Sequence, residues 1–204
     1  MDGVIVDSEP RHERAFLDVV REIGYGERLA LRFADYVGRS DRELWADFVA
    51  AHKPPYTLER LLAMKRERTL EIIRRERPLF KGLPELVQAL GARFSLAVAS
   101  GSERLVVEEV LRIDGLGRFF TVVVTAADVP RGKPAPDIFL RTAALLEVEP
   151  AACWVIEDSK AGVAAALAAG MRVIAITNTY PAEALANATR VVRTYDEIGR
   201  LLLA

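Results

Sequence analysis

The hydrophobic positions of this 204-residue chain change their spacing near residue 80. Before that point, apolar residues recur every three or four positions, the spacing of a helix with one buried face. This pattern predicts amphipathic helices over residues 11–24, 41–50 and 57–73. After that point, short apolar runs alternate with helical stretches, and the runs predict strands near residues 94–99, 120–124, 153–156, 171–176 and 190–193.

Strands that alternate with helices form parallel sheets, because each crossover helix returns the chain to the same end of the sheet. We therefore expect an α/β fold with a doubly wound, Rossmann-like parallel sheet. The helical block before residue 80 interrupts this alternation, so we interpret it as an insert. The expected division is an α/β core of residues 1–9 and 79–204 and a helical domain of residues 10–78.

Composition narrows the range of partners. A hydrophobic content of 51% is enough for a sizeable core. A formal charge of −1 and the lack of a long basic run argue against nucleic acid or an anionic membrane surface as the main partner. No apolar stretch approaches the roughly 20 residues of a membrane span. The single cysteine cannot form an internal disulfide, so we expect a cytoplasmic protein. We also expect a monomer or a weak homodimer.

Polar residues end the apolar run at 94–99. Ser100, Gly101 and Ser102 follow it directly, ahead of a helical pattern. A hydroxyl and free amides at a strand end and a helix N-terminus suit an anion such as phosphate. Taken alone, this segment is better explained by Ser102 capping the helix.

Two acids, Glu157 and Asp158, end the apolar run at 153–156. Paired carboxylates at a strand end suit a hard cation with oxygen ligands, typically Mg²⁺. The alternative is that Asp158 or Ser159 caps the following helix while Glu157 is solvated, and for these residues alone that is the better explanation.

A lysine stands on a stiff turn between these segments. Residues 131–137 read Arg-Gly-Lys-Pro-Ala-Pro-Asp, so Lys133 precedes two prolines that restrict the backbone. An ammonium held in this way can offset the charge of clustered carboxylates and phosphate. A single lysine is more often a solvated surface charge.

Four segments together resemble the haloacid dehalogenase superfamily of phosphatases. In chain order they are Met-Asp-Gly-Val-Ile-Val-Asp-Ser at residues 1–8, the strand end at Ser100, Gly-Lys-Pro-Ala-Pro-Asp at 132–137, and Glu-Asp-Ser-Lys-Ala-Gly-Val at 157–163 with Ala-Gly-Met at 169–171. The first segment matches the family pattern D-x-D-G-x-x-x-D-S/T from its second position onward. The resemblance covers nearly the whole chain and implies an α/β core with an inserted helical cap, as in β-phosphoglucomutase-like and phosphoglycolate phosphatase-like members.

The resemblance also implies a role for each matching residue. Asp2 is expected to act as general acid and base, Ser100 to bind the transferring phosphoryl group, and Lys133 to offset its charge. Mg²⁺ is the implied cofactor, held by the backbone carbonyl of Asp2, the carboxylate of Asp158 and, directly or through water, Glu157. The implied partner is a small phosphorylated metabolite such as a sugar phosphate. The residues expected to contact it are Gly3, Gly101, Ser102 and, in the cap, Arg39.

The nucleophile of the family pattern has no counterpart in the sequence, because Met1 occupies the position that follows it. We expect that a start assigned to an internal methionine removed this aspartate and the strand that carries it. That strand would be central, between those at 94–99 and 153–156. A chain that starts at Met1 should then be destabilised, fill the gap with residues 4–6, or borrow a strand from a neighbour.

Several functions share these motifs. A halide leaving group needs no proton, so the acid at Asp2 points to phosphate esters and away from haloalkanoate dehalogenases. A β-phosphoglucomutase-like mutase stays open, although Asp41 takes the position of the mutase arginine. His12 matches a hinge-region histidine of those members, but a single histidine on an amphipathic helix is more often structural. Two rivals remain: a phosphoacceptor receiver module, and a catalytically silent fragment that binds anions or metal.

Overall fold

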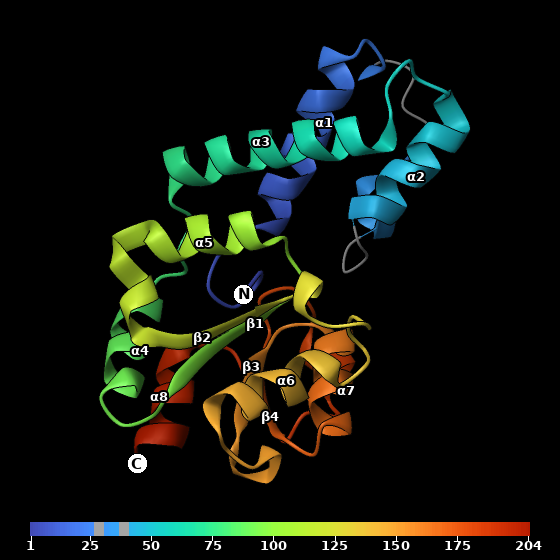
Figure 1. The fold of residues 1–204 in the computed structure, drawn as a ribbon. Helices are drawn as coiled ribbons and strands as arrows, with labels where there is room; N and C mark the ends of the chain where they lie inside the picture. The colour runs from blue at the N-terminus through green and yellow to red at the C-terminus, as the bar shows by residue number, and fades with distance from the viewer. Residues whose placement is uncertain (27–30, 37–40) are drawn as a thin grey trace. The chain divides into compact units, whose positions relative to one another are not determined.

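The computed structural model describes residues 1–26, 31–36 and 41–204. It divides into a core unit, Met1–Asp7 with Pro78–Ala204, and a helical unit, Ser8–Arg77. The structure thus places the two boundaries after residues 7 and 77, close to the positions after residues 9 and 78 that the sequence predicted. Figure 1 shows the two units as ribbons, and each is described by itself below.

The described residues of the helical unit include three α-helices and a short 3₁₀ helix. Aromatic rings fill its centre: the Trp45 ring centroid lies 4.8 Å from that of Phe16 and 5.3 Å from that of Phe48. All three side chains are fully buried, which explains the helical spacing of apolar residues in this block. The elements are α1 (Glu9–Glu22), η2 (Phe33–Tyr36), α2 (Asp41–His52) and α3 (Leu58–Glu76), and they confirm the predicted helices.

The core unit alternates strands and helices, which confirms the predicted α/β fold. Its strands are β1 (Leu96–Ser100), β2 (Phe120–Thr125), β3 (Trp154–Glu157), β4 (Arg172–Ile176) and β5 (Arg190–Val192). Its α-helices are α4 (Leu83–Gly91), α5 (Arg104–Arg112), α6 (Asp137–Leu146), α7 (Lys160–Ala168) and α8 (Tyr195–Leu203). Short 3₁₀ helices occur at Ile113–Phe119 (η3), Ala126–Asp128 (η4), Pro150–Ala152 (η5) and Ala182–Leu185 (η6). Every strand lies within two residues of its predicted position.

The strands form two separate parallel sheets. β1 pairs with β2, and β3, β4 and β5 pair in that order. β1 and β3 are not paired with each other, so the described strands leave a break where the sequence predicted a gap.

Residues 4–6 do not fill this break with a strand. Gly3–Ile5 form a turn, in which the amides of Val4 and Ile5 donate to the carbonyl of Met1 at 3.1 and 2.6 Å. The β contacts of this segment are two isolated bridges, from Val6 to Asp2 and from Val6 to Leu79. The expectation that residues 4–6 replace the central strand is therefore not what the structure shows.

The break does not prevent a packed core. α6 and α7 bury Ile138, Phe139 and Val163 against the strands, where Val173 and Ala175 of β4 are fully buried. Among the described residues, no helix has the length and apolar character needed to cross a bilayer.

Candidate active site

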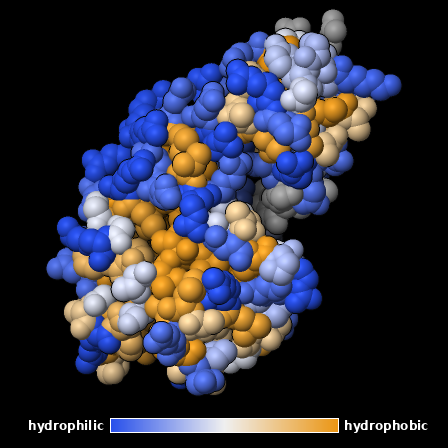
Figure 2. All heavy atoms as spheres, viewed as in Figure 1, coloured by the Kyte–Doolittle hydropathy of each residue, from blue (hydrophilic) through white to orange (hydrophobic). Residues whose placement is uncertain are grey.

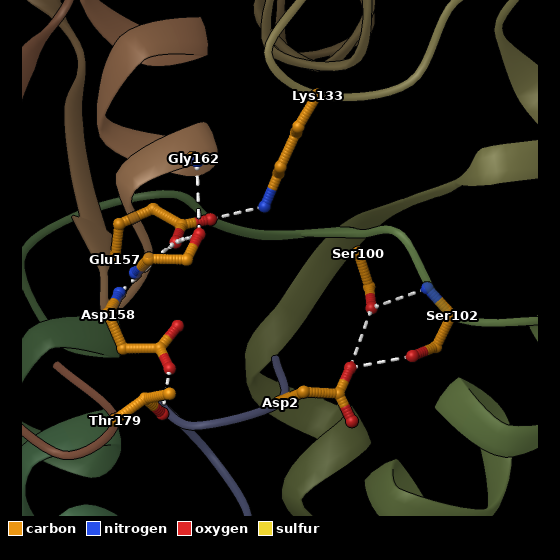
Figure 3. Close-up of polar contacts among 9 residues, drawn as sticks. Asp2, Ser100, Ser102, Lys133, Glu157, Asp158, Gly162 and Thr179 are labelled. Atoms are coloured by element: carbon orange, nitrogen blue, oxygen red, sulfur yellow. Dashed lines mark hydrogen bonds and ion pairs between the residues drawn. The ribbon is translucent and has the colours of Figure 1, made fainter. Parts of the chain in front are cut away.

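The segment at residues 2–4 crosses the carboxyl ends of several strands and places an acid there. Oδ2 of Asp2 accepts a hydrogen bond from the Ser102 hydroxyl at 2.6 Å and a longer one from the Ser100 hydroxyl at 3.3 Å. The amide of Ser102 in turn donates to the Ser100 hydroxyl oxygen at 3.1 Å. The two serines thereby orient the Asp2 carboxylate at the end of β1, as Figure 3 shows.

Lys133 and Glu157 form a second pair at this edge. The lysine ammonium contacts Oε1 of Glu157, and both side chains are largely buried. Burial alone would raise the pKa of Glu157, but the charge of Lys133 and hydrogen bonds from Lys133 and Ser159 hold it below its usual range. Glu157 is therefore an ionised carboxylate that fixes the position of Lys133.

Backbone and hydroxyl donors occupy the other oxygen of Glu157. Oε2 accepts from the amides of Asp158 and Ser159 at 3.1 and 3.2 Å and from the Ser159 hydroxyl at 3.0 Å. The same hydroxyl oxygen accepts from the amide of Gly162 at 3.0 Å and so caps α7. Ser159 therefore caps α7, as expected, while Glu157 is buried and not solvated.

Asp158 lies close to the Asp2 segment and has an unusual proton affinity. Burial and the negative charge of Glu157 raise its pKa to about 6, against the effect of a hydrogen bond from Thr179. A Cβ added at Gly3 would stand 1.8 Å from Oδ2 of Asp158, and Gly3 has a positive φ of 65°. Only glycine therefore allows the segment to approach Asp158 this closely.

Three residues of this site were missed by the sequence analysis. The Thr179 hydroxyl donates a hydrogen bond to the Asp158 carboxylate. The Asn178 amide nitrogen donates to the carbonyl of Gly3 at 2.8 Å and contacts the Tyr195 hydroxyl, which donates to the carbonyl of Val4 at 2.8 Å. The available signal was the polar run Thr-Asn-Thr directly after β4, since ligand sites of open parallel sheets form beyond the carboxyl ends of the strands.

The structure thus brings together Asp2, Gly3, Ser100, Ser102, Lys133, Glu157 and Asp158. Gly101 lies between the two serines, where an added Cβ would meet no atom within 4 Å. Arg39, the residue expected to contact substrate from the cap, lies outside the described residues.

The fit of a magnesium ion to this site depends on which carboxylates could bind it. In the part of the chain that the structure describes, no three His, Cys, Asp or Glu side chains are grouped so as to hold a metal ion. Mg²⁺ commonly uses one or two carboxylates and keeps several waters and phosphate oxygens as its other ligands. The charges of Glu157 and Asp2 both act against ionisation of the buried Asp158, so a cation beside it would relieve that repulsion. The residues present therefore fit Mg²⁺, with Asp158 as the carboxylate best suited to bind it.

A Thr179→Val substitution is expected to raise the pKa of Asp158 further above about 6, because it removes a hydrogen bond to the charged form. The folded protein already binds this proton more tightly than the unfolded chain, whose pKa is near 3.8. The contribution of Asp158 to stability should therefore fall as pH rises from that value towards 6. A ¹³C NMR titration of the aspartate carboxyl carbons measures the shift, with Thr121→Val as a control distant from Asp158. An unchanged or lower pKa in Thr179→Val would contradict the assignment.

Comparisons with known proteins identify the family of this chain. A family model described as haloacid dehalogenase-like hydrolase matches residues 1–170. Hexitol phosphatase B of Escherichia coli (strain K12) is 35% identical over 183 residues, covering 86% of this chain and 80% of its own. Fructose-1-phosphate phosphatase YqaB of the same strain is 33% identical over 178 residues, covering 85% and 92%.

The fold agrees as well. The crystal structure of CbbY from Rhodobacter sphaeroides in complex with phosphate superposes with a TM-score of 0.84 at 26% identity, covering 98% of this chain and 93% of that one. The family match spans the Asp2 segment, the serines after β1, Lys133 and the acids after β3. This chain belongs to the haloacid dehalogenase-like hydrolase family.

Proposed function

We propose that the protein hydrolyses a small phosphate monoester, such as a sugar phosphate, through an aspartyl-phosphate intermediate and with Mg²⁺ as its cofactor. The observation that carries this proposal is the position of Asp2, whose carboxylate the Ser102 and Ser100 hydroxyls hold at 2.6 and 3.3 Å and whose neighbour Gly3 stands against Asp158. A carboxyl group fixed at a strand end is placed to exchange a proton with an ester oxygen. The hexitol phosphatase and fructose-1-phosphate phosphatase relatives support the choice of a sugar phosphate.

In the proposed reaction, which has two steps, each site residue has its own role. In the first step an aspartate nucleophile attacks phosphorus, the ester P–O bond breaks, and Asp2 gives its proton to the leaving oxygen. In the second step Asp2 takes a proton from water, which attacks the same phosphorus, breaks the bond between the aspartyl oxygen and phosphorus, and releases phosphate. The Ser100 hydroxyl and the Lys133 ammonium, oriented by Glu157, stabilise the charge on the phosphoryl oxygens. Mg²⁺ held by Asp158 and the carbonyl of Asp2 supplies further charge neutralisation when bound.

The nucleophile is the residue that this scheme lacks. Asp2 cannot both accept the phosphoryl group and protonate the leaving oxygen, and the family pattern has the acceptor immediately before Met1. We propose that phosphoryl transfer depends on an aspartate at that place.

Steady-state assays with Mg²⁺ on 4-nitrophenyl phosphate and a panel of sugar phosphates test the scheme. The chain beginning at Met1 is compared with a form that carries Phe-Asp before Met1. Activity is expected in the extended form alone, and Asp2→Asn in that form should lower kcat by roughly 10²- to 10⁴-fold. The exposed Asp114→Asn serves as a matched control with unchanged activity. Activity in both forms would contradict the assigned nucleophile, and activity in neither, with folded protein, would favour a silent, anion-binding or metal-binding protein.

A hydrolase agrees better with the cap than a mutase does. Asp41, at the position of the mutase arginine, accepts hydrogen bonds at 2.6 Å from Lys65 on both of its oxygens. This paired carboxylate offers no donor to the second phosphate of a bisphosphate, whereas an arginine at the same position would bind it. The sugar-phosphate panel therefore includes glucose 1,6-bisphosphate, and we expect turnover of monophosphates in preference to it.

A further inference from the structure

The segment that carries Asp2 is a turn whose amides bond within the segment itself. The amide of Gly3 donates to the carbonyl of Val6 at 2.9 Å, and the next two amides donate to the carbonyl of Met1. Gly3 has a positive φ of 65°, and glycine is the residue with the most backbone freedom. Contacts from other elements are therefore needed to hold this turn in one conformation. We call residues 2–6 the Asp2 turn.

Three other parts of the core unit bond three consecutive carbonyls of the Asp2 turn. The Asn178 side-chain amide donates to the carbonyl of Gly3 at 2.8 Å. The Tyr195 hydroxyl donates to the next carbonyl, that of Val4, also at 2.8 Å. The backbone amide of Phe80 donates to the third carbonyl at 3.3 Å. The residues that carry these carbonyls are buried, so each carbonyl needs a protein donor in place of water.

Tyr195 connects the other two donors. Its hydroxyl contacts the amide nitrogen of Asn178 at 3.0 Å, and its ring centroid lies 6.0 Å from that of Phe80. The residue is only 7% exposed. Burial holds the pKa of the Tyr195 hydroxyl well above its usual range. The hydroxyl therefore stays protonated and remains a donor to the Asp2 turn at physiological pH.

Helix α8 gives Tyr195 a rigid base. Tyr195 is the first residue of this helix, and the preceding Thr194 caps it by accepting from the amide of Glu197 at 3.3 Å. One turn further along, Ile198 is fully buried, and α8 packs against α4. Figure 2 shows hydrophobic residues gathered over the part of the core unit where Figure 1 draws β1 and α8. The hydroxyl is thus carried by a packed helix and not by a loop.

The loop after β4 meets both halves of the candidate active site. Thr179 donates to the Asp158 carboxylate, and Asn178, the residue before it, bonds the Asp2 turn. Asp2 is thus held at two points, by the serine hydroxyls on its carboxylate and by the bonds to the backbone that follows it. Asn178 and Tyr195 both lie after residue 170, where the family match ends.

We propose that Tyr195, together with Asn178, is a positioning residue for proton transfer by Asp2. The inference rests on the phosphate-ester hydrolysis proposed above. A general acid must stay within hydrogen-bond reach of the leaving oxygen, and a displacement of about 1 Å can lower the rate by roughly 10²-fold. Without the Tyr195 hydroxyl the Val4 carbonyl loses its donor, the turn shifts, and Asp2 protonates the leaving oxygen less effectively.

The leaving group separates this role from a general loss of structure. 4-Nitrophenolate is a stable anion that leaves without a proton, whereas a sugar alkoxide needs one. In the form that carries Phe-Asp before Met1, Tyr195→Phe is expected to lower kcat/KM for the best sugar phosphate of the panel by roughly 10- to 100-fold, and for 4-nitrophenyl phosphate by less than about threefold. Asn178→Ala, at an exposed residue, should show the same selectivity. Tyr56→Phe removes an exposed hydroxyl in the helical unit and is the matched control, with kcat/KM unchanged for both substrates.

Hydrogen exchange provides a readout that needs no activity. In the chain that begins at Met1, the amides of residues 3–6 are expected to exchange roughly tenfold faster in Tyr195→Phe, because the turn opens more easily. Exchange in β4 (Arg172–Ile176) should not change, and Tyr56→Phe should leave both segments as they are.

Two results would overturn the proposal. Unchanged exchange of residues 3–6 in Tyr195→Phe would mean that the hydroxyl does not hold the Asp2 turn. Equal losses of kcat/KM for the two substrates would mean that the variant disturbs the site as a whole and not the position of the acid. If the extended form without any substitution is inactive, the proposed function fails, and the exchange result alone then decides whether Tyr195 holds the turn.

Discussion

Replacing Gly162 with alanine is expected to lower the free energy of unfolding of the core unit by about 2–3 kcal/mol. Gly162 lies in the first turn of α7, where alanine would ordinarily favour the helix by roughly 1 kcal/mol. Here a Cβ would stand 2.0 Å from Cδ of Glu157 and 2.2 Å from both of its carboxylate oxygens. Either the helix or the buried carboxylate must move, and moving Glu157 disrupts its bonds to Lys133 and Ser159.

A second glycine provides the matched control. Gly199 lies inside α8, and a Cβ there would meet Leu86 at 3.6 Å, which is ordinary contact. Gly199→Ala is therefore expected to stabilise the protein by about 0.5–1 kcal/mol. Urea unfolding followed by circular dichroism compares the two variants. If Gly162→Ala also stabilises the core, the close approach of α7 to Glu157 is wrong.

In the helical unit, Asp41→Ala is expected to destabilise more than Lys65→Met, although both remove the same ion pair. The Lys65 side chain is only 2% exposed, whereas that of Asp41 is 39% exposed. Removing Asp41 leaves a buried ammonium beside Nδ1 of His12, at 2.7 Å, without its carboxylate, and a buried charge without a counter-ion costs about 3 kcal/mol. Removing Lys65 leaves a carboxylate that water can reach, and methionine fills a similar volume, so the expected loss is about 1 kcal/mol.

The double variant separates charge from packing. Adding Lys65→Met to Asp41→Ala removes the buried charge, and we expect most of the lost stability to return. Fluorescence of Trp45, at the centre of the helical unit, follows unfolding there when the only other tryptophan, Trp154, is replaced by phenylalanine. Additive losses in the double variant, or a larger loss in Lys65→Met, would show that the ion pair is not buried in this way.

The second of these predictions concerns a contact between elements that are distant in the sequence. The pattern of residues 57–73 predicted an amphipathic helix, and a lysine at position 65 fits the polar face of such a helix equally well. Its burial became visible only when α1 and α2 supplied His12 and Asp41. The same holds for Asn178 and Thr179, whose partners Gly3 and Asp158 are distant in sequence.

The sequence by itself determined the helices, the strands and the family, because apolar spacing and turn residues act locally and the motif strings are specific. The family resemblance also implied a break between β1 and β3, because the strand that precedes Met1 in the family pattern lies between them in such a fold. Only the tertiary structure decided that residues 4–6 turn back instead of filling the break, and that Glu157 binds Lys133 while Asp158 binds Thr179. The physical reason is that these choices depend on which buried polar groups find partners from other elements, and that competition is settled only when all the elements pack together.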